Sequence, residues 1–125
     1  MSQVLRIATP TEGAGGLDAQ RSAHFGHAAS FTIIDLVDGQ IAGSNVVVKP
    51  PHEHGGCGLV VQQLAQEGVS AVIVAGMGNG PRSAMAANGM QALHDPVSAT
   101  PRAAVAAYLD GALPHFGGEH ACRGH

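Results

Sequence analysis

Three metal-ligating side chains stand within six residues, at His52, His54 and Cys57. Imidazole nitrogen and thiolate sulfur suit soft or borderline metals such as zinc, copper(I) and iron–sulfur units. The glycines among them leave the backbone free to turn all three toward one centre. Cys57 is expected just before a helix N-terminus, where the helix dipole favours a thiolate. The pattern predicts a metal site, and its alternative is a solvated loop with incidental histidines.

The last residues of the sequence repeat the same ligand types, as His120, Cys122 and His125. We expect residues 1–114 to form one α/β domain and residues 115–125 to form a tail that is too short to fold alone. The tail is then either disordered or a second ligand set. Because a tethered ligand set binds at high effective concentration, we hypothesise that the tail closes over a metal held first by Cys57.

Glycines are also concentrated at Gly76, Gly78 and Gly80, between an apolar run and a helical pattern. Backbone N–H groups in such a loop can bind an anion, for example a negatively charged metal–sulfur cluster. A dinucleotide phosphate is an alternative, since Asp95 follows about 20 residues on, as a ribose-binding acid would. Taken alone, this loop is most simply a tight turn between a strand and a helix.

Regular patterns separate these segments and must position them. Asp38-Gly39 predicts a two-residue hairpin turn, and Thr100-Pro101 predicts a helix N-terminus. The order of elements predicts a mixed five-stranded sheet, built from an antiparallel hairpin plus βαβ units, flanked by helices and centred on its first strand. We expect strands at residues 5–9, 30–37, 40–49, 71–75 and 90–93, and helices at 59–67, 81–89 and 101–110.

Composition argues against several classes of protein. The 125 residues carry a formal net charge of −3, and the six Lys+Arg are scattered, whereas nucleic-acid binding needs clustered cations. No apolar stretch approaches the roughly 20 residues of a membrane span. The N-terminus lacks the apolar core of a signal peptide, so we expect a cytoplasmic protein. Neither a carboxylate cluster nor a Ser-His-Asp set indicates an enzyme.

One more histidine-bearing segment, His24-Phe25-Gly26-His27, precedes the predicted hairpin. From spacing alone, it would hold a capping histidine and a core phenylalanine. Together with Gly55-Gly56-Cys57-Gly58 and residues 76–81, in this order, it resembles the dinitrogenase iron–molybdenum cofactor biosynthesis family, of the NifX and NifB C-terminal type. The resemblance covers about residues 4–114, and the His-Phe-Gly triplet is its most specific part.

This resemblance implies a ribonuclease H-like fold and a role in binding or delivering iron–molybdenum or related metal–sulfur clusters. It implies cluster contacts at His24, Phe25, Gly26 and the glycine loop. The loop of residues 52–57 and the tail are not universal in the family, and they strengthen the case for a metal.

The leading hypothesis is a non-catalytic carrier of a metal–sulfur cluster. Its partners would be cofactor-biosynthesis or metalloenzyme proteins, and the chain would be a monomer or weak homodimer. A simple zinc, copper or nickel chaperone could use the same ligands. A nucleotide-binding sensor or enzyme would instead use the glycine loop.

Overall fold

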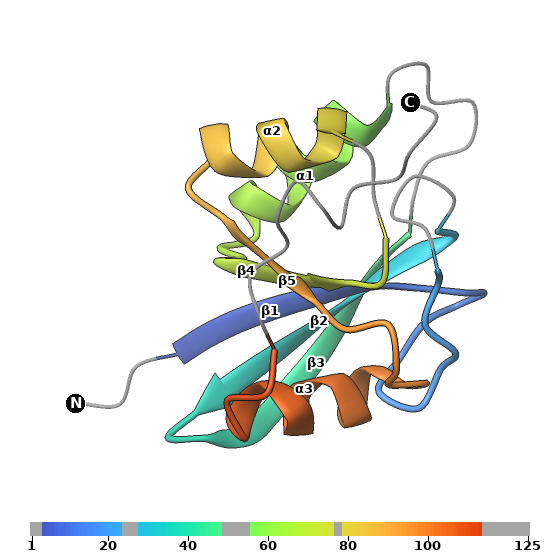
Figure 1. The fold of residues 1–125 in the computed structure, drawn as a ribbon, viewed down its shortest axis with the longest axis vertical. Coiled ribbons are helices and arrows are strands. Elements are labelled where there is room, and N and C mark those ends of the chain that lie inside the picture. Colours follow the sequence, from blue (N-terminus) through green and yellow to red (C-terminus); the bar gives the residue numbers. More distant parts are fainter. Residues whose placement is uncertain (1–3, 24–27, 49–55, 77–78, 114–125) are drawn as a thin grey trace.

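The computed structural model describes residues 4–23, 28–48, 56–76 and 79–113. They form a five-stranded sheet with helices on both faces (Figure 1). The strands are β1 (Val4–Thr11), β2 (Ser30–Val37), β3 (Gln40–Val48), β4 (Ala71–Val74) and β5 (Gln91–His94). The helices are α1 (Gly56–Gln66), α2 (Asn79–Ala87) and α3 (Pro101–Leu109).

The strand order is β3-β2-β1-β4-β5. β1 pairs antiparallel with β2, and β2 pairs antiparallel with β3. β4 runs parallel to β1, and β5 runs parallel to β4. This mixed sheet with β1 at its centre confirms the predicted α/β fold class, and it is consistent with the ribonuclease H-like fold that the resemblance implies.

Two of the predicted local signals are confirmed by backbone geometry. Asp38 and Gly39 join β2 to β3 with φ of 53° and 78°, the positive values that a two-residue hairpin turn needs at both central positions. Thr100 caps α3, because its side-chain oxygen accepts a hydrogen bond from the Ala103 N–H while Pro101 occupies the first turn.

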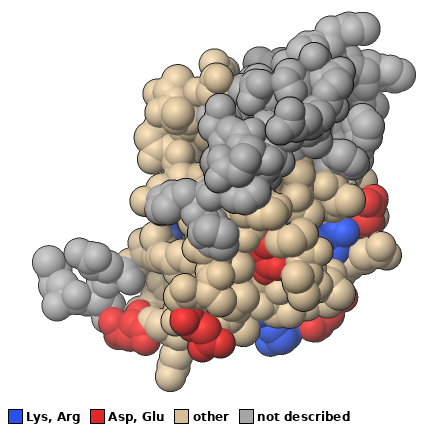
Figure 2. Space-filling model, viewed as in Figure 1, with Lys and Arg blue, Asp and Glu red and all other residues tan. Residues whose placement is uncertain are grey.

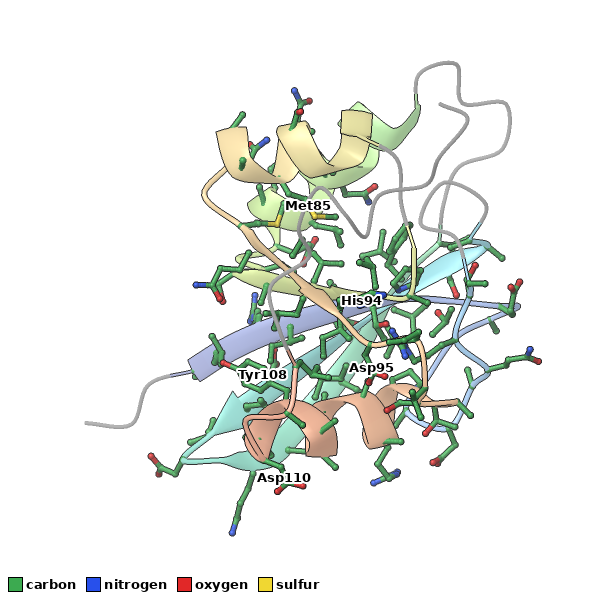
Figure 3. The ribbon with its side chains drawn as sticks, in the orientation of Figure 1. Met85, His94, Asp95, Tyr108 and Asp110 are labelled. Atoms are coloured by element: carbon green, nitrogen blue, oxygen red, sulfur yellow. The ribbon has the colours of Figure 1, made fainter. Side chains whose placement is uncertain are left out.

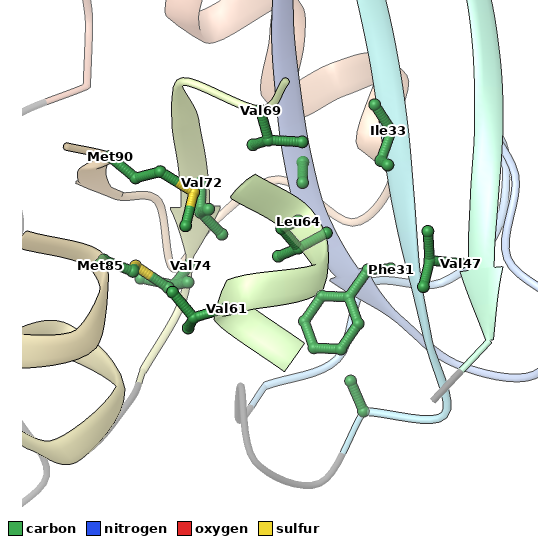
Figure 4. Packing of buried hydrophobic residues seen from close by; sticks show 12 residues of the cluster. Phe31, Ile33, Val47, Val61, Leu64, Val69, Val72, Val74, Met85 and Met90 are labelled. Atoms are coloured by element: carbon green, nitrogen blue, oxygen red, sulfur yellow. The ribbon is translucent and has the colours of Figure 1, made fainter. Parts of the chain in front are cut away.

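The sheet buries a separate hydrophobic cluster on each face. On one face, α1 and α2 pack Val61, Leu64 and Met85 against β2 and β4 (Figure 4). On the other face, α3 packs Ala104 and Val105 against the sheet. Neighbouring residues of β1 point to opposite faces, as strand geometry requires: Ile7 belongs to the α3 cluster and Ala8 to the α1–α2 cluster.

Two helices begin earlier than their periodicity predicts. α1 begins at Gly56, so Cys57 lies in its first turn and not in the loop before it. α2 begins at Asn79, so Gly80 lies inside the helix and the loop after β4 is shorter than expected. Glycine is well tolerated where a helix begins, and a run of glycines therefore hides the true start.

β1 is longer than predicted, because it continues through Pro10 to Thr11. β1 pairs with β4 only at Ile7 and Ala8. Beyond Ala8, β1 has no partner in β4, and an isolated bridge joins Thr11 to Arg21 on that side. The missing N–H of Pro10 therefore costs no ladder hydrogen bond to β4.

Among the described residues, no helix is both long and apolar enough to cross a membrane.

Candidate functional site

Several chain ends meet at one edge of the sheet. The parallel strands β1, β4 and β5 all finish there. β2 begins at the same edge and β3 ends there, since Ser30 pairs with both Thr11 and Val48. The Ser70 N–H, just after α1, bonds the Arg6 carbonyl at the opposite edge, so α1 begins on the side where β1 ends. We call this the carboxyl edge.

The predicted site residues are covered unevenly by the described structure. Cys57 lies in the first turn of α1, Gly76 lies two residues after β4, and Gly80 is the second residue of α2. All three positions follow a strand that ends at the carboxyl edge, since Cys57 follows β3 while Gly76 and Gly80 follow β4. The other predicted ligands and contacts lie outside the described residues: His24, Phe25, Gly26, His52, His54, Gly78, His120, Cys122 and His125.

A buried hydroxyl cluster lies on the α3 face at the carboxyl edge. The Thr11 and Ser30 oxygens are 2.7 Å apart, and those of Thr11 and Thr32 are 3.1 Å apart. The loop that follows β1 covers this cluster, since the Gly16 N–H donates to Thr32 Oγ1 at 2.9 Å. The cluster therefore fixes the beginning of β2 against the loop that leads to residues 24–27.

Arg21 lies in the same loop and is buried, with 3% of its side chain exposed. Its Nε donates to Thr9 Oγ1 at 2.9 Å, and its Nη1 donates to the carbonyl oxygens of Asp95 and Ser98 at 3.0 and 2.9 Å. Thr9 in turn donates to the Ile73 carbonyl at 2.7 Å. One side chain thus links the ends of β1 and β4 with the loop after β5.

The backbone on either side of residues 24–27 is also fixed. The Arg21 N–H donates to the Ala99 carbonyl at 2.9 Å, and the Ser22 N–H donates to the Pro10 carbonyl at 2.9 Å. On the other side, Ala28 is 2% exposed and belongs to the α1–α2 cluster. Both flanks of the predicted His24 contact are therefore held at the carboxyl edge.

Asp95 follows β5 directly (Figure 3). It is buried beside Arg21. Its Oδ1 accepts hydrogen bonds of 2.9 Å from the N–H groups of Val97 and Ser98, and its Oδ2 lies 3.8 Å from Arg21 Nη1. Burial by itself would raise the pKa of Asp95. The hydrogen bonds from Ser98 and Val97 and the charge of Arg21 outweigh it, so the pKa lies below its usual value.

This arrangement weakens the nucleotide alternative. The Asp95 carboxylate is buried and faces Arg21 and the loop after β5, so it is not presented to a ribose. The mixed sheet also differs from the mostly parallel sheet of dinucleotide-binding folds.

Within the described ranges, no three His, Cys, Asp or Glu side chains come together as a metal site. Charges are sparse on the face in Figure 2, and on its described part Lys and Arg do not gather into one patch.

Burial lowers the pKa of Arg21, and the Asp95 charge opposes that shift.

Comparison with known proteins identifies the family. The family model described as dinitrogenase iron-molybdenum cofactor matches residues 3–111. The chain belongs to this family. The resemblance inferred from the His-Phe-Gly segment and the glycine loops is confirmed, and with it a cofactor-related role. Comparison with curated proteins gives no significant match.

Solved structures agree with this assignment. The apo form of the orange protein from Desulfovibrio gigas is 30% identical, with a TM-score of 0.76, and the match covers 92% of this chain and 95% of that one. A NifB-like protein from Thermotoga is 26% identical, with a TM-score of 0.71 and coverage of 90% and 93%. A dinitrogenase-like protein from Methanocaldococcus jannaschii shares the fold at 14% identity and a TM-score of 0.69, over 89% and 93% of the two chains.

Sequence reasoning did not find Arg21 or the buried hydroxyls. In the sequence, Arg21 is one of six scattered basic residues, and Thr9, Thr11 and Thr32 carry no motif. A signal was available, because an arginine between a Gly-rich loop and a predicted ligand segment is a candidate anchor. Its partners, however, lie up to 77 residues away in sequence, where local patterns give no information.

Proposed function

We propose that this protein binds and delivers a metal–sulfur cluster of the iron–molybdenum-cofactor type, or its precursor, as cargo and without catalysing a reaction on it. The observation that carries the proposal is the common carboxyl edge. The described flanks of residues 24–27, the first turn of α1 and the loop after β4 all lie at this edge. Ligands from three separate segments can then share one centre, as binding sites in open α/β sheets do.

The donor set fits such a cargo. In this proposal Cys57 is the central ligand, supported by His52, His54 and His24. Its position in the first turn of α1 favours the thiolate, because the helix dipole is positive there. Backbone N–H groups near Gly76, Gly78 and Gly80 would donate hydrogen bonds to the negatively charged cluster. Phe25 and Gly26 complete the contacts carried over from the family resemblance.

Family membership supports a cluster of the iron–molybdenum-cofactor type as the cargo. The relative from Desulfovibrio gigas is described as an apo form. The proposed partners are cofactor-biosynthesis or metalloenzyme proteins that supply or receive the cluster. We propose a cytoplasmic monomer or weak homodimer. A zinc, copper or nickel chaperone is the second hypothesis for the same ligands, because thiolate and imidazole bind those metals too.

Anaerobic reconstitution tests the proposal. The protein is incubated with ferrous iron, molybdate and sulfide, desalted, and analysed for metals, sulfide and visible absorption. The proposal predicts strong visible bands with stoichiometric sulfide, and their loss in Cys57→Ser. Zinc or copper that the protein retains from its expression host, bound without sulfide, would support the simple chaperone instead.

A relocated thiol provides the control. The double variant Cys57→Ser/Ser83→Cys keeps two cysteines but moves one to the exposed side of α2. If this variant binds as much cluster as the wild type, thiol number decides binding and the proposed site is wrong.

A further inference from the structure

Arg21 and Asp95 are the two charged residues that are buried in the described part of the chain. Removing such a pair from water costs free energy that their attraction only partly offsets, so a buried ion pair is weak evidence for stability alone. We infer that Arg21 is a positioning residue for the ligand segment 24–27. This inference rests on the proposed function.

The geometry supports positioning over direct binding. The Nε and Nη1 hydrogens of Arg21 are directed to Thr9, Asp95 and Ser98. Its Nη2 is also directed inward, 3.4 Å from the Ile73 carbonyl. The guanidinium therefore has little capacity left for a cluster. It acts through the backbone that follows it.

Covalent connection makes this action local. His24 follows Ser22 by two residues, a tether of about 7 Å in extended chain. The Ser22 N–H is bonded to Pro10, and the Arg21 N–H is bonded to Ala99. Arg21 thus fixes the origin of the tether against the ends of β1 and β4 and the loop after β5. Without the side chain, only the backbone bonds hold this origin, and the entropy cost of ordering His24 on the cluster rises.

Arg21→Gln tests the inference. Cluster affinity should fall about 10- to 100-fold, the usual effect of removing a group that orients a metal ligand, and the visible bands should shift. Amide hydrogen exchange should accelerate in residues 22–29. Arg21→Lys keeps the positive charge beside Asp95 and should restore part of the affinity.

Two control variants separate positioning from stability. Val105→Ala creates a cavity under α3 but removes none of the Arg21 hydrogen bonds, so it destabilises the fold by a different route. Arg6→Gln removes an arginine that bonds Asp35 and the Glu67 carbonyl at the opposite end of β1. Neither should change cluster affinity by more than about twofold, well under the range expected for lost ligand orientation.

Each outcome decides the inference. If Arg21→Gln and Val105→Ala have equal melting temperatures and also bind the cluster equally tightly, Arg21 is not a positioning residue. If Arg21→Gln does not fold, Thr9→Val removes the acceptor of Arg21 Nε while keeping the charge, and it takes the place of Arg21→Gln. If the wild type takes up no cluster, the proposed function fails. Hydrogen exchange then decides separately, because unchanged exchange in residues 22–29 would refute the anchoring.

Discussion

The hydroxyl oxygens of Thr11 and Ser30 lie 2.7 Å apart, in a buried contact that joins the last residue of β1 to the first residue of β2. Two same-face pairs further along the sheet, Ile7 and Ile34 are apolar and packed under α3. The face becomes polar where the loop after β1 replaces α3 as its cover. Loop backbone needs hydrogen-bond partners when it is buried, and the hydroxyls supply them.

Gly15→Ala should destabilise the fold more than Gly13→Ala. Both glycines have positive φ, of 76° and 59°, so both substitutions strain the backbone by about 1–2 kcal/mol. A Cβ at Gly15 would also lie 2.9 Å from Ser30 Oγ and 3.0 Å from Thr32 Oγ1, whereas a Cβ at Gly13 meets nothing within 4 Å. We expect an additional loss of about 1–3 kcal/mol at Gly15 from overpacking. Urea denaturation measures both variants, and equal losses would contradict the close contact.

Thr32→Val should lower the free energy of unfolding by about 1–3 kcal/mol. Valine keeps the shape of threonine but leaves the Gly16 N–H without the oxygen that it contacts at 2.9 Å, and it also removes a partner of Thr11. Ser44→Ala in β3 is the control, because Ser44 is exposed and its loss should change stability by less than about 0.5 kcal/mol. Chemical denaturation at neutral pH compares the two.

The fold was predictable where local chemistry decides it. Asp38-Gly39 allows positive φ at both turn positions, Thr100-Pro101 both caps and starts a helix, and residues 71–74 are continuously apolar, as befits a strand that is buried along its whole length. The anchoring of the candidate site was not predictable. Arg21 contacts residues 12, 74 and 77 positions away, and only the assembled sheet brings them together. The ligand assignments themselves remain predictions, since most lie outside the described residues.

Asp95→Asn should reduce the loss of folding stability that occurs as the pH falls below neutral. The pKa of Asp95 is lowered in the folded state from a reference of 3.8. Below about pH 3.8 the unfolded chain therefore binds more protons than the folded one, and stability falls as pH falls through the folded pKa. The contribution of the carboxylate is fully present at neutral pH. The variant should be less stable there and should lose less on acidification.

Urea denaturation from pH 7 to pH 2.5 measures this difference, with Asp110→Asn as the control. Asp110 is an exposed carboxylate at the end of α3 (Figure 3), so its variant removes one acidic group without touching the Arg21 contacts. An Asp95→Asn curve parallel to the wild type would show that the buried carboxylate contributes nothing to the pH dependence.

Removal of residues 118–125 should weaken cluster or metal binding without lowering the melting temperature. The described chain ends at Leu113, which packs against the α3 cluster, and the Ala112 N–H donates to the Ala107 carbonyl at 3.0 Å. Truncation leaves these contacts intact. From Leu113 to Cys122 the chain has nine residues, about 30 Å when extended, against a radius of gyration of about 14 Å for a domain of this length. The extended tail thus spans about two radii of gyration, which is the reach that closure over Cys57 requires.

If Cys122 with His120 or His125 completes the site around Cys57, the tail binds as a tethered ligand set. Its removal then lowers affinity about 100-fold or more, and Cys57→Ala nearly abolishes binding with or without the tail. Isothermal titration with zinc measures these affinities in four proteins: the wild type, the truncated chain, Cys57→Ala and the truncated Cys57→Ala. Repetition at tenfold dilution shows whether the tail that binds belongs to the same chain or to a second one. Affinity independent of protein concentration indicates closure within one chain, whereas weaker binding on dilution indicates a tail that serves a second subunit. Unchanged affinity and stoichiometry after truncation would remove the tail from the site and leave Cys57 with His52, His54 and His24.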